Sequence, residues 1–328
     1  MRIGIIGAGA MGSTYGGLLA LAGYDVCLFD VRQDLVERIT HHGLKLDGVC
    51  GPKTIKIKVT SNPNDIRDVD LVMIWTDTNN TRQAAELAGS MMSSTGFAIT
   101  LQNGIGNIET LVEVLGAQRV VAGSSMCSAA TAGLGDARFT HRGMTSIGEL
   151  DGKASDRVTV LAQALRQAGF DVDIRPDILS LVWTKFALNC SINALCAVTG
   201  LRLGELARVP ATNAFQDGII DEILNVIDAC GIRLTDPDIR ATVKKHTFLK
   251  YSRPSMLQAI EAGKRTEIDS LNMKIVEEGR KHAIPTPFNE ALVMLLKGVE
   301  FRAMVARDRT EADYVALEAK AATEPFSQ

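Results

Sequence analysis

The sequence has little net charge and no long uninterrupted apolar segment, and these absences exclude several classes of protein. Its 328 residues carry 35 Lys and Arg against 38 Asp and Glu, a net charge of −3, so nothing predicts binding to nucleic acid or to an anionic membrane. The longest apolar runs are broken by charges or glycines and are shorter than the ~20 residues that cross a bilayer. A strand pattern begins at Ile3, so we expect no signal peptide.

The six cysteines and five histidines form no metal-binding or disulfide pattern. The cysteines are scattered without a C-x-x-C pair, and several lie in apolar segments, as reduced thiols of a protein core do. None of the histidines has the spacing of a zinc site or a catalytic triad. We therefore expect a cytoplasmic protein without a metal site. The length predicts about two domains, and no internal repeat or low-complexity segment is present.

The first thirty residues have the pattern of a dinucleotide-binding unit. A strand pattern at 2–6 is followed by GAGAMG at 7–12, a helix pattern to about residue 22 and a second strand at 25–30. This is the order of strand, glycine turn, helix and strand that the G-x-G-x-x-G motif requires. We therefore predict that a dinucleotide binds here.

Each glycine of this motif has a separate role. Gly7 allows the tight turn, Gly9 lets the backbone approach a pyrophosphate, and Gly12 permits close packing of the helix on the strand. The start of the helix then offers free N–H groups and the positive end of its dipole to the phosphates. The predicted cofactor-binding residues of this turn are Gly7, Ala8, Gly9, Ala10, Met11 and Gly12.

Asp30 stands at the end of the second strand, where an acidic residue is expected about 20 positions after the glycines. Its carboxylate could accept hydrogen bonds from both hydroxyls of the adenosine ribose, and it would repel a 2′-phosphate. Arg32 could hold such a phosphate instead. The cofactor is therefore expected to be NAD or NADP, with NAD favoured by Asp30.

The pattern continues with strands at 70–75 and 96–101 and a helix at 82–92 between them. Alternating strands and helices predict an α/β fold with a doubly wound parallel sheet. Asn103 then lies at the carboxyl end of a strand, where such sheets bind ligands, although an ordinary Asn-Gly turn would have the same letters. Short β-like segments from 119 to 150 indicate meander strands that cover one edge of the sheet.

A helix pattern at 155–168 and a strand at 170–174 close the first domain, and a boundary is expected at Pro176 and Asp177. The predicted domains are 1–175 and 176–328. Helix patterns follow almost continuously after the boundary, at 178–199, about 211–230, 236–250, 254–281 and 286–305. The second domain is therefore expected to be all-α.

Lys185, Asn189 and Asn193 interrupt the otherwise apolar segment 179–200. A spacing of four residues places their side chains within an arc of about 80° on one helix. Because a buried polar group without a partner costs about 1–3 kcal/mol, this polar stripe indicates a cleft or ligand beside the helix, or else neighbouring backbone groups that satisfy it.

A nicotinamide enzyme that reduces a carbonyl needs a proton donor, and no histidine is suitably placed. Lys185 is the best candidate, because an unperturbed lysine has a pKa of about 10.4 and is protonated at neutral pH. An ammonium beside the carbonyl oxygen stabilises the developing alkoxide and can protonate it. A second polar segment, 255–272, places Ser255 and Glu267 in a long helix pattern, where Glu267 could equally be a solvated charge.

Four segments together resemble the ketopantoate reductase family: GAGAMG, LQNGIGN at 101–107, KFALNCSIN at 185–193, and SML with KRTEID between 255 and 269. The resemblance extends to about residue 305 and includes HAIPTP at 282–287. It implies a Rossmann domain joined to a helical domain of the 6-phosphogluconate dehydrogenase type, with the substrate in the cleft between them. The implied reaction is the NAD(P)H-dependent reduction of 2-dehydropantoate (ketopantoate).

The resemblance also implies roles for individual residues. Lys185 would donate the proton to the 2-keto oxygen, Glu267 would contact the substrate hydroxyl, and Asn103 would lie where nicotinamide and substrate meet. The implied substrate-lining residues are Asn189, Asn193 and Ser255.

Several positions depart from the family pattern. Asp30 and Asp77 stand where the family usually has basic residues near the cofactor, which favours NAD. Leu203 and Ser252 replace polar positions that contact substrate in the family. The substrate could therefore be another branched or larger 2-keto acid. The sequence also fits a related dehydrogenase of a β-hydroxy acid, an opine or a polyol phosphate, or a nucleotide-sensing binding protein. A homodimer is also possible.

Overall fold

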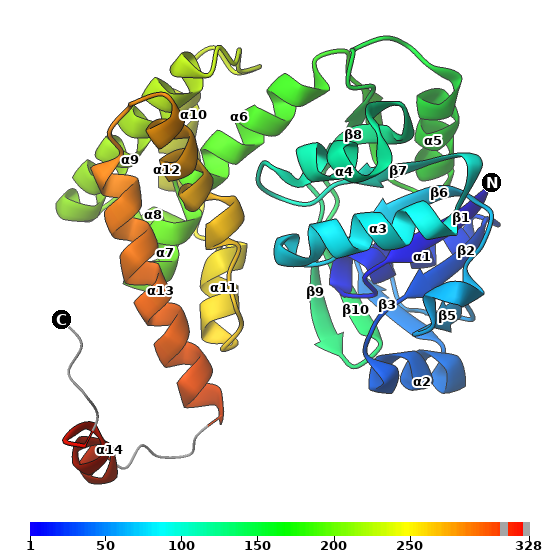
Figure 1. The fold of residues 1–328 in the computed structure, drawn as a ribbon, viewed down its shortest axis with the longest axis horizontal. Coiled ribbons are helices and arrows are strands. Elements are labelled where there is room, and N and C mark those ends of the chain that lie inside the picture. The colour runs from blue at the N-terminus through cyan, green and yellow to red at the C-terminus, as the bar shows by residue number, and fades with distance from the viewer. Residues whose placement is uncertain (309–313, 324–328) are drawn as a thin grey trace.

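The computed structural model describes residues 1–308 and 314–323. Figure 1 shows a sheet-containing first half and a second half made of helices, with α6 running between them. The predicted α/β fold with a Rossmann-like first domain and a helical second domain is confirmed. The end of the predicted second domain, at 328, lies outside the described residues.

The main sheet has eight strands in the order β12-β11-β8-β7-β6-β1-β2-β5. All its pairings are parallel except the antiparallel pair of β8 and β11. The strands are β1 (Arg2–Ile6), β2 (Asp25–Phe29), β5 (Lys58–Thr60), β6 (Val69–Ile74), β7 (Met92–Thr100), β8 (Val120–Ser125), β11 (Met144–Gly148) and β12 (Asp171–Ile174). The helices of this domain are α1 (Ala10–Leu21), α2 (Gln33–His42), α3 (Thr81–Met91), α4 (Asn107–Leu115) and α5 (Asp156–Gln167).

A second sheet has four strands in the order β4-β3-β10-β9. They are β3 (Leu44–Gly48), β4 (Lys53–Ile55), β9 (Ser128–Gly133) and β10 (Asp136–His141). The prediction that the strands of 119–150 cover one edge of the main sheet was therefore wrong in part. β8 and β11 belong to the main sheet, whereas β10 pairs with β3 of the second sheet and β9 pairs with β10.

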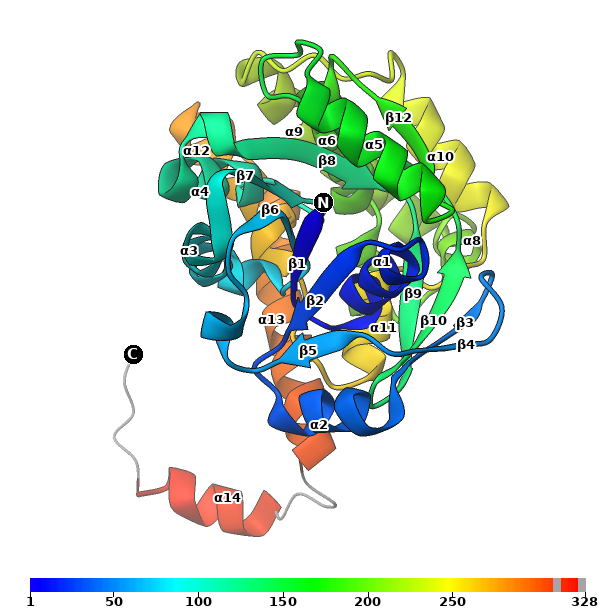
Figure 2. The ribbon, with the colours of Figure 1, turned by 90° about the vertical axis from the view of Figure 1, so that its right-hand side faces the viewer.

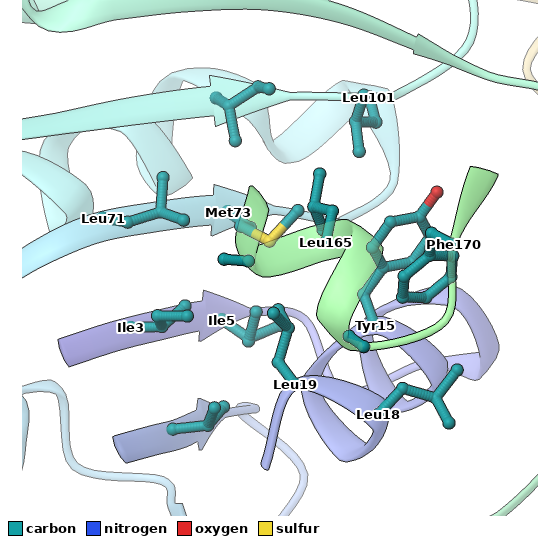
Figure 3. Packing of buried hydrophobic residues seen from close by; sticks show 14 of the residues in the cluster. Ile3, Ile5, Tyr15, Leu18, Leu19, Leu71, Met73, Leu101, Leu165 and Phe170 are labelled. Carbon is teal, nitrogen blue, oxygen red and sulfur yellow. The ribbon is translucent and has the colours of Figure 1, made fainter. Parts of the chain in front are cut away.

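Helix α1 lies between the two sheets, which explains why its sequence is rich in glycine (Figure 2). A Cβ atom at Gly16 would lie 2.6 Å from Leu28 of the main sheet, and one at Gly17 would lie 2.9 Å from Leu46 of the second sheet. Tyr15 of α1 is fully buried in the same core and stacks on Phe170 at 4.1 Å between ring centroids (Figure 3). The absence of side chains at Gly16 and Gly17 thus allows α1, the helix after the turn at 7–9, to pack closely on both sheets.

The second domain is all-α, as predicted. Its helices are α6 (Ile178–Cys190), α7 (Asn193–Thr199), α8 (Leu203–Leu206), α9 (Pro210–Ala229), α10 (Ile239–Leu249), α11 (Ser255–Glu261), α12 (Asn272–Lys281), α13 (Pro287–Asp308) and α14 (Tyr314–Ala321). Since β12 ends at Ile174 and α6 begins at Ile178, we propose that the first domain ends at residue 175 and the second begins at residue 176.

Two of the predicted helices are interrupted. The segment 178–199 is broken at Ser191, whose buried hydroxyl donates to the Ala187 carbonyl at 2.7 Å, a contact that competes with regular helix. In the segment 254–281 the first helix, α11, ends at Glu261, and Gly263 shortly after it has a left-handed φ of +62°, as at many helix ends. A short 3₁₀ turn, η4 (Ile268–Ser270), then precedes α12. Glu267 therefore lies in a turn rather than in a long helix.

The expectation that every apolar run is too short for a bilayer does not hold for Ile178–Thr199. This stretch is long and apolar enough by length and composition to cross a membrane, but 56% of its most apolar window is buried inside the protein. Phe186, Cys190 and Leu195 belong to the core of the second domain. Burial of this kind marks a core segment.

Candidate active site

The glycine turn after β1 has the geometry that a pyrophosphate requires. Gly7 has a φ of +98°, and a Cβ atom there would lie 2.8 Å from the Trp75 backbone. A Cβ atom at Gly12 would lie 1.9 Å from the Gly7 carbonyl oxygen, whereas one at Gly9 would meet nothing within 4 Å. Gly7 and Gly12 are therefore needed for the fold, and Gly9 leaves open space in front of the helix.

The start of α1 can hold an anion. Gly9 is the N-cap, no side chain caps the helix, and its first turn contains no acidic residue. The N–H groups of Ala10, Met11 and Gly12 lie in this first turn, where a helix lacks carbonyl partners of its own. Together with the helix dipole, they favour a bound phosphate. The residues present thus fit the pyrophosphate of a dinucleotide.

Asp30 is held in place by the protein itself. One carboxylate oxygen accepts the Ala8 N–H at 2.9 Å, and the other accepts the Arg32 N–H at 3.1 Å and the Arg32 Nε at 3.2 Å. The amide of Ala8, one of the predicted cofactor-binding residues, thus bonds to Asp30. The Asp30 carboxylate retains acceptor capacity for a ribose hydroxyl, and the half-exposed Arg32 side chain lies beside it.

Asn103 follows the carboxyl end of β7 and reaches the second domain. Its side-chain amide donates to a Glu267 carboxylate oxygen at 3.3 Å, and its carbonyl accepts the Asn107 side-chain amide at 2.9 Å. The neighbouring Gln102 donates to the Thr76 carbonyl at 2.7 Å, which ties the ends of β6 and β7 together. Asn103 therefore lies in the bend after β7, held by hydrogen bonds to Glu267 and Asn107, rather than in an Asn-Gly turn free of such contacts.

Lys185 connects α6 to the main sheet, because its Nζ donates to the backbone carbonyl of Ser125 at the end of β8. Burial lowers the pKa of Lys185 from 10.5 to about 8, and the nearby Glu267 and Cys127 oppose that shift. Most of the lysine is still protonated at neutral pH. It is, however, a much stronger proton donor than a lysine in water.

A hydrogen-bonded group that the sequence did not reveal lies behind Lys185. The Tyr15 hydroxyl bonds to the Ser125 hydroxyl at 2.9 Å and to the Thr145 hydroxyl at 2.6 Å, and the Cys127 N–H donates to the Ser125 hydroxyl at 3.1 Å. Tyr15 is in α1, whereas the other three are in or next to β8 and β11. This group fixes the carbonyl that receives Lys185, and no motif or spacing in the sequence indicates it.

Glu267 lies opposite Lys185, within reach of its charge. Burial raises the pKa of Glu267, while the Asn103 hydrogen bond and the charge of Lys185 counteract the rise and Asp77 adds to it. The turn that carries Glu267 is anchored on α13. Glu300 accepts the N–H of Thr266, and Lys297 forms an ion pair with Asp269 at 2.6 Å.

The other predicted site residues lie at different depths. Asn189 is partly buried one turn beyond Lys185, Asn193 is buried at the first position of α7, and Ser255 is exposed at the first position of α11. Within 1–308 and 314–323, none of the three side chains has a hydrogen-bond partner in the protein. Of the predicted polar stripe, Lys185 therefore has a backbone partner, whereas the Asn189 and Asn193 side chains remain available to a ligand, and Asn193 belongs to α7 rather than to the same helix.

Leu203 does not offer a position in the site. Its side chain is 3% exposed and belongs to the core of the second domain, so its difference from the family pattern reflects packing. The backbone N–H of Leu203 donates to the carbonyl oxygen of Ser252 at 3.5 Å. Ser252 itself is an exposed residue.

Two family descriptions match this chain. Residues 3–152 match "Ketopantoate reductase PanE/ApbA", and residues 177–300 match "Ketopantoate reductase PanE/ApbA C terminal". The 2-dehydropantoate 2-reductase of Archaeoglobus fulgidus is 32% identical over 300 residues, which cover 91% of this chain and 98% of that protein. The enzyme of the same name from Halobacterium salinarum is 28% identical over 90% of this chain and 98% of its own.

Solved structures show the same similarity. A PanE/ApbA family ketopantoate reductase from Ralstonia eutropha JMP134 is 32% identical with a TM-score of 0.86, covering 92% of this chain and 99% of its own. A D-mandelate dehydrogenase solved with NADH and anilino(oxo)acetate is 25% identical with a TM-score of 0.85, covering 92% of this chain and 99% of its own.

Proposed function

The chain belongs to the ketopantoate reductase family of NAD(P)-dependent oxidoreductases, and we propose that it reduces 2-dehydropantoate to pantoate. The observation that carries this proposal is the meeting of three side chains where the two domains touch. Asn103 of the first domain bonds to Glu267 of the second, and Lys185 lies within electrostatic reach of Glu267.

Lys185 is the proposed proton donor. The bound nicotinamide supplies the hydride to the ketone carbon, and the carbonyl oxygen needs a proton as its charge develops. A donor works best when its pKa is near the operating pH, and burial brings Lys185 to about 8. The ammonium also stabilises the negative oxygen before the proton moves.

Glu267 and Asn103 would hold the substrate in line with Lys185. The Glu267 carboxylate can accept a hydrogen bond from the substrate hydroxyl, and Asn103 keeps that carboxylate oriented from the other domain. Asn189 and Asn193 offer amide donors to the substrate carboxylate, and Ser255 offers a hydroxyl at the mouth of the site. Asn103 belongs to the first domain, and Lys185 and the other four residues belong to the second. Substrate binding would therefore favour closure of the two domains on each other.

We propose NADH as the preferred hydride donor. The carboxylate of Asp30 can bond to a ribose hydroxyl and would repel a 2′-phosphate. Arg32 lies at 3.2 Å from that carboxylate, so its charge is already partly neutralised. A 2′-phosphate would have to compete with Asp30 for the guanidinium.

A second candidate substrate is another branched or larger 2-keto acid. The similarity to a D-mandelate dehydrogenase solved with anilino(oxo)acetate favours it, since that compound joins an aromatic ring through nitrogen to an oxoacetate group. A β-hydroxy acid, an opine and a polyol phosphate have no such support. A nucleotide-sensing protein without catalysis would not need the Lys185–Glu267–Asn103 arrangement.

The deciding experiment follows nicotinamide absorbance during reduction of 2-dehydropantoate, with NADH and NADPH in parallel and an aromatic 2-keto acid as a third substrate. Turnover of 2-dehydropantoate with a higher kcat/KM than the aromatic acid would support the proposal. Faster turnover of the aromatic acid would transfer it to the second candidate. Tight NADH binding without turnover of either acid would contradict both.

Two further properties are proposed with the function. Exposed apolar side chains on α13, among them Met294, Leu295 and Phe301, favour a homodimer, which sedimentation measurements at several protein concentrations would test. The six cysteines are all free thiols, which favours the reducing cytoplasm.

A further inference from the structure

We propose that Cys230, Glu278 and His282 form a binding site for a zinc-type divalent cation. The thiol sulfur, a carboxylate oxygen and an imidazole nitrogen all lie within 4.8 Å of one another. Small rotations of these side chains would bring three such atoms to the distances of about 2.0–2.3 Å at which zinc is bound. The fold alone brings the three together, since Cys230 belongs to a different helix end from the other two.

The two helices that supply these residues both end at the site. Cys230 is the C-cap of α9, and His282 is the C-cap of α12, with Glu278 one turn earlier on the same helix. The carboxyl end of a helix carries a partial negative charge that favours cations. The two helix ends and the three potential ligands therefore all favour a cation at the same place.

The ligand types indicate which cation fits. Thiolate and imidazole select borderline-soft metals such as Zn²⁺, whereas Ca²⁺ and Mg²⁺ prefer sites made of oxygen atoms. Three protein ligands complete a tetrahedral site when water supplies the fourth. The chemistry therefore favours Zn²⁺, or Co²⁺ as its spectroscopic substitute.

Lys281 is the charge that a cation would have to displace. Its Nζ lies 2.7 Å from one Glu278 oxygen, and its side chain is 64% exposed. It can move into water at little cost, because exposed pairs of this kind contribute about 0–1 kcal/mol. Within the described residues, the other Glu278 carboxylate oxygen has no ion pair or hydrogen bond, so it is free to bind a metal.

The site has a structural connection to the active site. Cys230 begins the loop between α9 and α10, and in that loop the N–H of Thr235 donates to the Thr184 hydroxyl at 2.8 Å. Thr184 immediately precedes Lys185 on α6. A cation that joins the ends of α9 and α12 would therefore stabilise the loop that braces the start of the catalytic segment, and it should raise the melting temperature.

The test is titration of protein without a polyhistidine tag with Co²⁺, followed by the thiolate-to-cobalt charge-transfer absorption and by melting temperature. We expect one equivalent of Co²⁺ to produce the band and raise the melting temperature, and excess Zn²⁺ to abolish the band. Cys230→Ser should lose the band, and Cys50→Ser, which removes a similarly half-buried thiol outside the site, should keep it.

Two further variants make the result independent of the folding of the cysteine variant. Glu278→Gln and His282→Asn should each keep the band but weaken Co²⁺ binding at least about tenfold, since each removes a direct ligand and even an outer-shell partner contributes about 10–100-fold. No band in the wild type, or a band that persists in Cys230→Ser, would overturn the site. Unchanged affinity in both of the other variants would also overturn it and indicate adventitious binding to a thiol.

Discussion

The side-chain amide of Asn103 lies 3.3 Å from the carboxylate of Glu267 and joins the two domains at the candidate active site. Asn103 extends from the end of a strand of the main sheet, and Glu267 lies in a turn anchored on α13. The bond counteracts the rise that burial causes in the pKa of Glu267. The contact between domains and the charge state of the site are therefore coupled.

Replacing Lys185 should remove catalysis without removing the cofactor site. Lys185→Ala deletes the proton donor, and a positioned acid typically contributes a factor of about 10²–10⁴ to the rate. We expect kcat to fall by that amount while NADH affinity, measured by fluorescence quenching, changes less than about twofold, since Lys185 bonds to Ser125 of β8 and is not part of the glycine turn. The exposed Lys153→Ala serves as control, and equal turnover in Lys185→Ala would refute the assigned role.

The rate of reduction should depend on pH through Lys185. Its pKa of about 8 lies below the ordinary 10.5, so the protonated donor is lost as pH rises through 8, and kcat/KM should fall above that value. Because the charge of Glu267 raises the pKa of Lys185, Glu267→Gln should move this alkaline limb to lower pH. Profiles from pH 6 to 10 would test this, and a limb at the same pH in both proteins would contradict it.

The buried charge of Lys185 should lower the free energy of unfolding at neutral pH. Its pKa is lower in the folded protein than in the unfolded chain, so stability rises with pH between about 8 and 10.5 as the buried charge is lost. Lys185→Met should therefore raise the free energy of unfolding at pH 7 by about 1–3 kcal/mol. Each unit by which folding lowers the pKa costs about 1.4 kcal/mol of stability, and the loss of the hydrogen bond to Ser125 offsets part of the gain. The gain should shrink toward pH 10. Urea unfolding at both pH values measures it, and a gain that grows with pH would contradict the buried-charge argument.

The first domain was predictable because its signals are local. GAGAMG between two strand patterns indicated the Rossmann-like unit, and the change to helix patterns near Pro176 indicated that an all-α part follows. The position of β9 and β10 was not predictable, because the pairing of β10 with β3 joins segments about 90 positions apart and has no period in the sequence. The interruption at Ser191 was missed because the apolar pattern continues on both sides of it. The one at Gly263 lies in the polar segment EAGKRTE, where a glycine followed by basic residues is an ordinary signal for a helix end.

The candidate site was predictable only where a residue carries its own signal. Lys185, Asn189 and Asn193 interrupt an apolar segment, so their spacing indicated a polar stripe. Tyr15 and Ser125, which fix the carbonyl that Lys185 contacts, look like ordinary core and loop residues. Their role arises from tertiary contacts, which periodicity cannot show.

Cofactor preference should depend on the charge of Asp30. Asp30→Asn keeps an acceptor for the Ala8 N–H but removes the repulsion of a 2′-phosphate and releases Arg32 from its ion pair. We expect the ratio of kcat/KM with NADPH to that with NADH to rise about tenfold, which corresponds to about 1.4 kcal/mol. Arg32→Ala in the same background should reverse the gain. A ratio that does not change in Asp30→Asn would show that other residues select the cofactor.

Gly104→Ala should separate the two domains at the active site. Gly104 follows Asn103 with a φ of +84°, and a Cβ atom there would lie 2.3 Å from the backbone oxygen of Ser270. The added carbon must push η4 away, which lengthens the Asn103–Glu267 hydrogen bond, so we expect kcat to fall by at least about tenfold, as misplacement of an aligned site does.

The matched control is Gly298→Ala on α13, where a Cβ atom meets nothing within 4 Å. Alanine at this helical position should leave kcat unchanged and stabilise the protein by about 0.5–1 kcal/mol. If Gly104→Ala retained full activity with an unchanged melting temperature, the close approach of Gly104 to Ser270 would not be needed for catalysis.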